Sequence, residues 1–293
     1  KTIGKTHALH SATSFAVAVI VSRTAGSVQR EKSKVNYQQK KQNGKRSECY
    51  ERDHSKPLCQ KVRAGLHRPP GAVKRTVLAA AVQAPTAGGQ QLYTILDITD
   101  QRLKDTLAET CDHQPFISTA PVVLIFCADC LRWWDAYAEA GCDPRRPGPG
   151  DLMLAVNDAV IAAQNAVVAA ESLGLGSCYI GDIMERYEEH RRLLGLPEWV
   201  FPACMLVMGY PTRQQRERKK AARFEQRFIV QENAYCRLEG TRLREMYRGH
   251  TGAQSFEDFL AAFCRRKYES DFSREMSRSV GQYLKDFQGE AEV

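Results

Sequence analysis

The sequence lacks the ligand pattern of a structural metal site. Cys127-Ala-Asp-Cys130 is a single Cys-x-x-Cys pair, and zinc would require a second pair or histidines at ligand spacing. The ten cysteines stand at irregular spacings in a chain of 293 residues, which is too long to depend on a disulfide scaffold. We therefore expect no metal, reduced cysteines that mostly pack in the core, and a cytoplasmic location.

The N-terminal part lacks a hydrophobic run of membrane-spanning length. Residues 14–21 are apolar but too short to cross a bilayer, and with Lys1 and Lys5 before them they resemble a signal peptide only weakly. Residues 30–56 are polar and basic without periodicity, which is typical of disorder. We predict that residues 1–58 are disordered or a non-native extension, that the folded domain spans residues 59–293, and that no membrane is involved.

A basic face for nucleic acid is missing from the main part of the chain. Residues 1–75 hold 17 Lys and Arg and four Asp and Glu, a charge of +13, so the remainder carries −5 of the total +8. Nucleic-acid binding favours basic residues on one folded face with aromatics between them, and the sequence after residue 75 has no such pattern. We expect no nucleic-acid partner, although a basic N-terminal tail leaves a non-enzymatic binding role as an alternative.

What the sequence does contain is a mixture of helical and strand patterns. With 43% hydrophobic residues the chain can bury a sizeable core. Apolar spacing predicts helices at 73–82, 103–110, 152–173, 186–194 and 256–287, and strands at 93–98, 121–127, 177–180 and 203–208. A charged loop is expected at 213–223. Alanines around much of the 152–173 helix imply burial on several sides.

The turn between the first predicted helix and the first predicted strand contains residues suited to binding a ligand. Pro85, Gly88 and Gly89 make a turn in which the backbone can approach a flat ligand closely. Thr86, Gln90 and Gln91 supply hydroxyl and amide donors. Such a turn is more often a plain loop, so its meaning depends on the segments that follow.

Three further segments follow this turn in a fixed order. They are Gln114-Pro-Phe-Ile117 before a buried strand, a helix ending Ala170-Glu-Ser-Leu-Gly174 that leads into Tyr179-Ile-Gly-Asp182, and Met208-Gly-Tyr-Pro211 followed by Arg223 and Glu232-Asn-Ala-Tyr235. Together with the turn they resemble the nitroreductase family of flavoproteins, over roughly residues 60–289. The resemblance is strongest to oxygen-insensitive nitroreductases and bacterial flavin reductases.

This resemblance implies an α+β fold. A central, mostly antiparallel sheet is flanked by helices, and the protein is an obligate homodimer with a C-terminal arm. It also implies that FMN is the cofactor and NAD(P)H the co-substrate. The residues that match family contacts to the cofactor are Arg63, Thr86, Gln91, Gln114, Tyr179, Ile180, Gly181, Asp182 and Arg223.

The predicted phosphate site departs from the family pattern. The family opens with Arg-x-x-Arg, where this chain has Gln60-Lys-Val-Arg63, so only Arg63 matches directly and Lys61 is a stand-in. Arg223 ends the family's Lys-Pro-Arg contact, but Ala221 takes the place of the lysine. Arginine suits phosphate because its planar fork donates two parallel hydrogen bonds.

The resemblance implies a reaction that asks little of side chains. Hydride passes from NAD(P)H through the flavin to a small aromatic acceptor (a nitroaromatic, a quinone or free flavin) in ping-pong turnover. We therefore expect no catalytic nucleophile or acid–base residue. A specialised member of the same superfamily, such as a reductive dehalogenase or a flavin-modifying enzyme, is the alternative, as is a non-enzymatic flavin-binding protein.

Overall fold

The computed structural model describes residues 69, 71–218 and 221–288. The predicted extension at residues 1–58 and the predicted cofactor contact Arg63 lie outside these residues.

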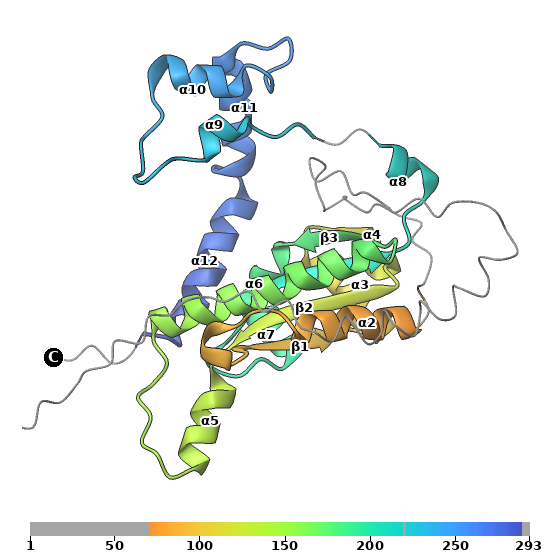
Figure 1. Ribbon diagram of the computed structural model, residues 1–293, viewed down its shortest axis with the longest axis vertical. Coiled ribbons are helices and arrows are strands. Elements are labelled where there is room, and N and C mark those ends of the chain that lie inside the picture. Colours follow the sequence, from red (N-terminus) through yellow and green to blue (C-terminus); the bar gives the residue numbers. More distant parts are fainter. Residues whose placement is uncertain (1–68, 70, 219–220, 289–293) are drawn as a thin grey trace, which may run out of the picture. The chain divides into compact units, whose positions relative to one another are not determined.

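Four strands form one antiparallel sheet, which confirms the predicted α+β class (Figure 1). The strands lie in the order β1-β2-β4-β3, so β1 and β3 are the two edges. Both central strands are buried along their whole length, as their apolar sequences predict. The bounds are β1 (Tyr93–Asp97), β2 (Val122–Asp129), β3 (Gly176–Ile180) and β4 (Val200–Gly209).

Strand β4 begins three residues before its predicted start because the sheet accommodates Pro202. The β2–β4 register shifts between Phe126 and Cys127, and Cys127 then lies opposite Pro202. Proline has no N–H for the ladder, and bulges are where sheets tolerate it. Strand β3 pairs with residues 205–209 of β4 and does not reach the proline.

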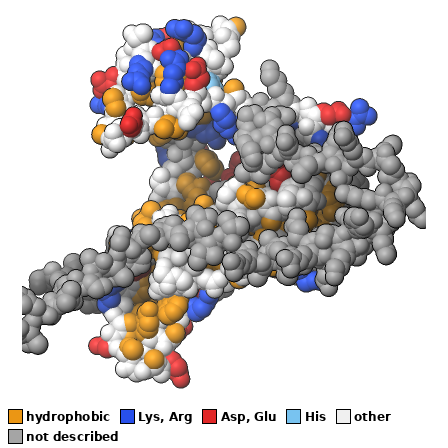
Figure 2. Space-filling view, viewed as in Figure 1, with side chains coloured by type: hydrophobic (Ala, Val, Ile, Leu, Met, Phe, Trp, Pro, Cys, Tyr) orange, Lys and Arg blue, Asp and Glu red, His pale blue; other side chains and the backbone are white. Residues whose placement is uncertain are grey.

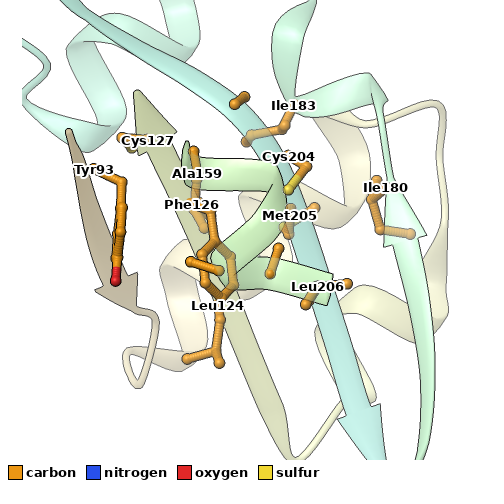
Figure 3. Close-up of a cluster of buried hydrophobic side chains, with 14 of the residues drawn as sticks. Tyr93, Leu124, Phe126, Cys127, Ala159, Ile180, Ile183, Cys204, Met205 and Leu206 are labelled. Atoms are coloured by element: carbon orange, nitrogen blue, oxygen red, sulfur yellow. The ribbon is translucent and has the colours of Figure 1, made fainter. Parts of the chain in front are cut away.

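The alanine-rich segment forms α6 (Pro149–Ser172), which contacts all four strands (Figure 1). Small side chains let this helix lie close to the sheet, and Figure 3 shows Ala159 among buried side chains that include Phe126 and Met205. Of the helices that the structure describes, α6 alone is long and apolar enough to cross a membrane. However, 44% of its most apolar window is buried inside the fold, as a core helix requires.

Shorter helices surround this core. Helix α2 (Gly71–Val82) packs on α6, and α3 (Gln101–Thr110) packs on α4 (Pro115–Thr119). Helix α3 starts where the Asp100 carboxylate accepts from the Leu103 N–H at 2.7 Å. Helix α7 (Tyr187–Leu194) ends at Gly195, whose φ of 62° is the left-handed conformation that glycine adopts easily. Helix α5 (Leu131–Glu139) was not expected from the sequence.

The C-terminal part corrects one prediction and refines another. The predicted charged loop begins with a short helix, α8 (Arg213–Glu217), because Thr212 and Gln215 form a capping box. The segment 256–287, predicted to be helical, forms two helices, α11 (Phe256–Lys267) and α12 (Asp271–Lys285). Ser270 caps the second of them by accepting from the Ser273 N–H at 3.3 Å, and this local hydrogen bond interrupts a continuous apolar periodicity.

Helices α9 (Gln226–Ile229) and α10 (Gly240–Tyr247) precede α11, and ring contacts link Phe224, Tyr247 and Phe256 in this segment. Helix α12 packs on the sheet domain. Its Tyr283 is buried, with ring-to-ring distances of 4.5 Å to Tyr187 and 5.1 Å to Phe201.

Candidate functional site

The predicted ligand-binding turn leads from α2 to β1 through a short 3₁₀ segment, η1 (Ala87–Gly89). Gly88, Gly89 and Gln91 all have positive φ, at 56°, 75° and 52°. Two glycines therefore stand where the left-handed conformation needs them. Gln91 adopts the same region with a side chain, which costs on the order of 1 kcal/mol and requires support from its surroundings.

A buried carboxylate on α6 holds this turn. Asp158 is 2% exposed and accepts hydrogen bonds from the Thr86 hydroxyl, from the Ala87 N–H at 2.9 Å and from the Leu92 N–H at 3.1 Å. The Thr86 oxygen in turn accepts from the Gln91 N–H at 2.7 Å. Three donors satisfy the charge of a carboxylate in an apolar helix. The sequence signal was an acid in the middle of this alanine-rich helix, and it was missed.

Thr86 and Gln91, two of the residues predicted to contact the cofactor, make hydrogen bonds within the protein. The Thr86 hydroxyl donates its hydrogen to Asp158, and Gln91 donates one of its two side-chain N–H groups to the Val82 carbonyl at 2.9 Å. Both side chains therefore brace the turn itself. An added Cβ at Gly89 would meet no atom of the described residues within 4 Å, so with respect to these residues the backbone faces open space. A flat ligand could approach it there.

A second group of predicted residues lies at the other edge of the sheet. Gln114 donates from Nε2 to the Cys111 carbonyl at 2.8 Å. Burial, followed by the negative charge of Asp182, raises the pKa of the Cys111 thiol, which puts Asp182 in the same neighbourhood. Tyr179 and Ile180 end β3 and lead through Gly181 into η2 (Asp182–Met184). Gln114 therefore lies in the same region as Asp182, the last residue of the Tyr179–Asp182 run.

The two groups are far apart within one chain. The turn joins β1 and the second group follows β3, and two strands lie between these edges. Figure 3 shows Tyr93 and Ile180 on opposite sides of the buried core. Since neighbouring strands are about 4.8 Å apart, the two edges are separated by roughly 14 Å across the sheet.

The one hydrogen bond described for Arg223 is to its own loop and to neither of the two groups. Its side chain is exposed and donates to the Ala221 carbonyl at 3.4 Å, within its own loop. Its neighbour Phe224 packs on Tyr247 and His250, at 5.2 and 4.3 Å between ring centroids.

Helix α5 supplies contacts that sequence reasoning missed. The Trp133 indole N–H donates to the Gln90 carbonyl at 2.7 Å, and Arg132 donates to the Tyr93 carbonyl at 3.0 Å. Beside them a cavity of about 440 Å³ is lined by Gln90, Leu92 and aromatic side chains of α5. Figure 2 shows hydrophobic side chains gathered over this helix. A Trp-Trp pair directly after a strand was the available signal.

The edge next to β3 contains a buried acid. Glu185 is 6% exposed, and among the described residues its Oε1 has no hydrogen-bond partner. Burial and then the negative charges of Asp182, Asp112 and Glu275 raise its pKa to about 7, against a smaller opposing effect of Arg186.

Known proteins resemble this chain along most of the described sheet domain. A family model described as "Nitroreductase family" matches residues 67–210. The oxygen-insensitive NADPH nitroreductase of Salmonella typhimurium is 32% identical over 168 residues, which are 57% of this chain and 67% of that protein. The FMN reductase (NAD(P)H) of Bacillus subtilis is 29% identical over 209 residues, which are 71% and 80% of the two chains.

The fold has the same relatives. The structure of the hypothetical oxidoreductase YcnD from Bacillus subtilis superposes with a TM-score of 0.65 and 26% identity, covering 76% of this chain and 92% of that one. Sequence similarity, fold and the order of the predicted segments agree with one another. The chain belongs to the nitroreductase family.

Proposed function

We propose that this protein is an FMN-dependent oxidoreductase that takes hydride from NADH or NADPH and reduces nitroaromatics, quinones or free flavin. The observation that carries this proposal is the turn at residues 84–91, where Asp158 and two glycines hold the backbone open to a flat ligand. The names of the relatives, an FMN reductase and an NADPH nitroreductase, support the same chemistry.

In this proposal the residues of the chain bind the flavin and orient it. When bound, FMN supplies the two-electron chemistry that links the nicotinamide to the acceptor. In the proposal the turn lies against the flavin, and the Tyr179–Asp182 run presents its backbone to the reactive edge. Arg223 and Arg63 neutralise the phosphate. No side chain is assigned a nucleophilic or acid–base role.

The proposal includes a homodimer, because one chain does not bring the two groups together. In the proposal, the turn of one chain and the Tyr179–Asp182 run of its partner contact the same flavin. An apolar surface on α6 supports such a contact. On the side of α6 away from the sheet, one row of side chains is apolar and partly exposed: Met153, Leu154, Val160, Ile161 and Val168.

The test is FMN retention with nicotinamide oxidation. We expect purified protein mixed with FMN to keep a yellow colour through gel filtration and to oxidise NADPH or NADH when a quinone is added. Protein that stays colourless and oxidises neither nicotinamide would refute the proposed function.

A further inference from the structure

Helix α5 contacts the same turn as Asp158, but through different backbone groups. Asp158 binds hydroxyl and N–H groups of the turn, whereas α5 and the end of β2 bind its carbonyls. The Gln90 carbonyl accepts from the Trp133 indole at 2.7 Å, and the Leu92 carbonyl accepts from the Asp129 N–H at 3.0 Å. The turn is therefore held by three elements: α6 binds its donors, and α5 and the end of β2 bind its carbonyls.

Arg132 strengthens the same contact. Its guanidinium donates to the Tyr93 carbonyl at 3.0 Å and to the Asp129 carboxylate at 3.1 Å, and it reaches the Gln91 carbonyl at 3.5 Å. Asp129 also accepts from the Arg132 backbone N–H at 3.1 Å, so the start of α5 is fixed to the end of β2. This network lies next to Gln91, whose left-handed backbone needs support.

We infer that Trp133 and Arg132 are positioning residues for the cofactor: they fix the carbonyls of Gln90, Gln91 and Tyr93, and through them the conformation in which the turn meets the flavin. The identity of the ligand, FMN, rests on the proposed function. The hydrogen bonds by which Trp133 and Arg132 hold the turn do not depend on it. Trp133 makes one hydrogen bond to the turn. Its ring lines the neighbouring cavity and lies 5.5 Å from the Tyr137 ring.

The chain offers a matched pair of variants. Trp133 and Trp134 are adjacent on one helix, and both line the cavity. The Trp133 N–H binds Gln90, whereas the Trp134 N–H has no hydrogen-bond partner among the residues that the structure describes. Replacing either by phenylalanine keeps an aromatic ring and removes the indole donor. Only Trp133→Phe should affect the turn.

The experiment measures two quantities on the full chain. The first is the Kd of FMN by fluorescence titration of the FMN-free protein, which we expect to rise about three- to tenfold in Trp133→Phe and to stay within about twofold in Trp134→Phe. The second is amide hydrogen exchange at Gln91 and Leu92 without FMN, which should be faster in Trp133→Phe alone. At saturating FMN the turnover number should return to the wild-type value, as expected of a positioning role.

The outcomes separate this inference from the proposed function. If wild-type protein binds no FMN, the proposed function fails, and hydrogen exchange alone still tests whether Trp133 holds the turn. If Trp133→Phe leaves both the Kd and the exchange unchanged, the inference is wrong. It is also wrong if Trp134→Phe changes both to the same extent, because the effect would then come from general loosening of α5.

Discussion

The two edges of the sheet differ in how their polar groups are satisfied. At the β1 edge, Asp158 accepts three hydrogen bonds and Trp133 and Arg132 donate to the carbonyls of the same turn. At the β3 edge, Glu185 is buried beside other acids, and its Oε1 has no partner among the described residues. At the first edge the polar groups are paired with one another. At the second, ionised Glu185 destabilises the folded state, and the size of this effect depends on pH.

The difference bears on function. A turn that must meet a flat ligand at close range benefits from being fixed before the ligand arrives. The opposite edge contains Glu185, whose protonation changes with pH. Helix α12 is attached at this edge: Ser279 donates to the Met184 carbonyl at 2.7 Å, and Glu275 accepts from the Arg186 N–H at 3.1 Å. We therefore expect the two edges to respond differently to mutation and to pH.

Removing the carboxylate of the paired edge should have the largest effect. Asp158→Ala leaves the Ala87 and Leu92 N–H groups and the Thr86 hydroxyl without their acceptor, and should lower the free energy of unfolding by about 3–5 kcal/mol. Urea denaturation measures this loss. Asp135→Ala, at an exposed position on α5, is the control and should stay within about 0.5 kcal/mol. Equal midpoints for the two variants would contradict the role given to Asp158.

The unpaired edge should respond to pH. Because the pKa of Glu185 is raised to about 7 in the folded protein from its usual 4.5, the folded state binds its proton more tightly than the unfolded state. Stability from this group is full below pH 4.5, declines as pH rises toward 7, and is absent above that. Glu185→Gln removes the dependence.

We expect Glu185→Gln to be more stable than wild type by roughly 1–3 kcal/mol at pH 8 and nearly equal to it at pH 4.5. Denaturation midpoints of both proteins between pH 4.5 and pH 8 give the comparison. A difference that stays constant over this range would show that Glu185 is not the titrating group.

The smallest effect is expected on the surface of the same edge. Arg278 donates to Glu188 at 2.9 Å and to Glu275 at 2.8 Å, and so joins α12 to α7. The Arg278 and Glu188 side chains are solvent-exposed and Glu275 is half-buried, and ion pairs that water reaches contribute little. Arg278→Ala should cost less than about 1 kcal/mol at low salt, and less still at high salt. A cost above 2 kcal/mol, unaffected by salt, would mean that this network is more important than exposure suggests.

Local patterns in the sequence predicted most elements of the fold. The helix at 152–173, all four strands and the glycine turn lie close to their predicted places, because apolar periodicity and turn residues act locally. One error came from an equally local cause that was overlooked, the Thr212 capping box that starts α8. The Ser270 cap that divides α11 from α12 is a local signal of the same kind.

The arrangement of the site could not be predicted in the same way. Asp158 lies 72 residues from Thr86 in the sequence, and Trp133 lies 43 from Gln90. Their contacts exist only after the sheet and α6 have assembled. The resemblance named residues on both edges as one site, but only the strand order reveals that a single chain keeps them apart. The assignment of these residues to the cofactor stays a prediction.

Complementation between two defective chains tests the central claim most directly. Gly89→Val forces a branched side chain into a φ of 75° in the turn. Gly181→Val places a branched side chain within the Tyr179–Asp182 run at the other edge, and its Cβ would have Met184 Cε at 3.8 Å, an ordinary contact. Each variant alone should lose FMN binding.

When the two variants are co-expressed, half of the dimers pair one chain of each kind, and each such dimer contains one intact site. The account predicts that FMN binding returns to roughly a quarter of the wild-type capacity. A mixture that binds no more FMN than either variant alone would contradict a site shared between two copies of this chain.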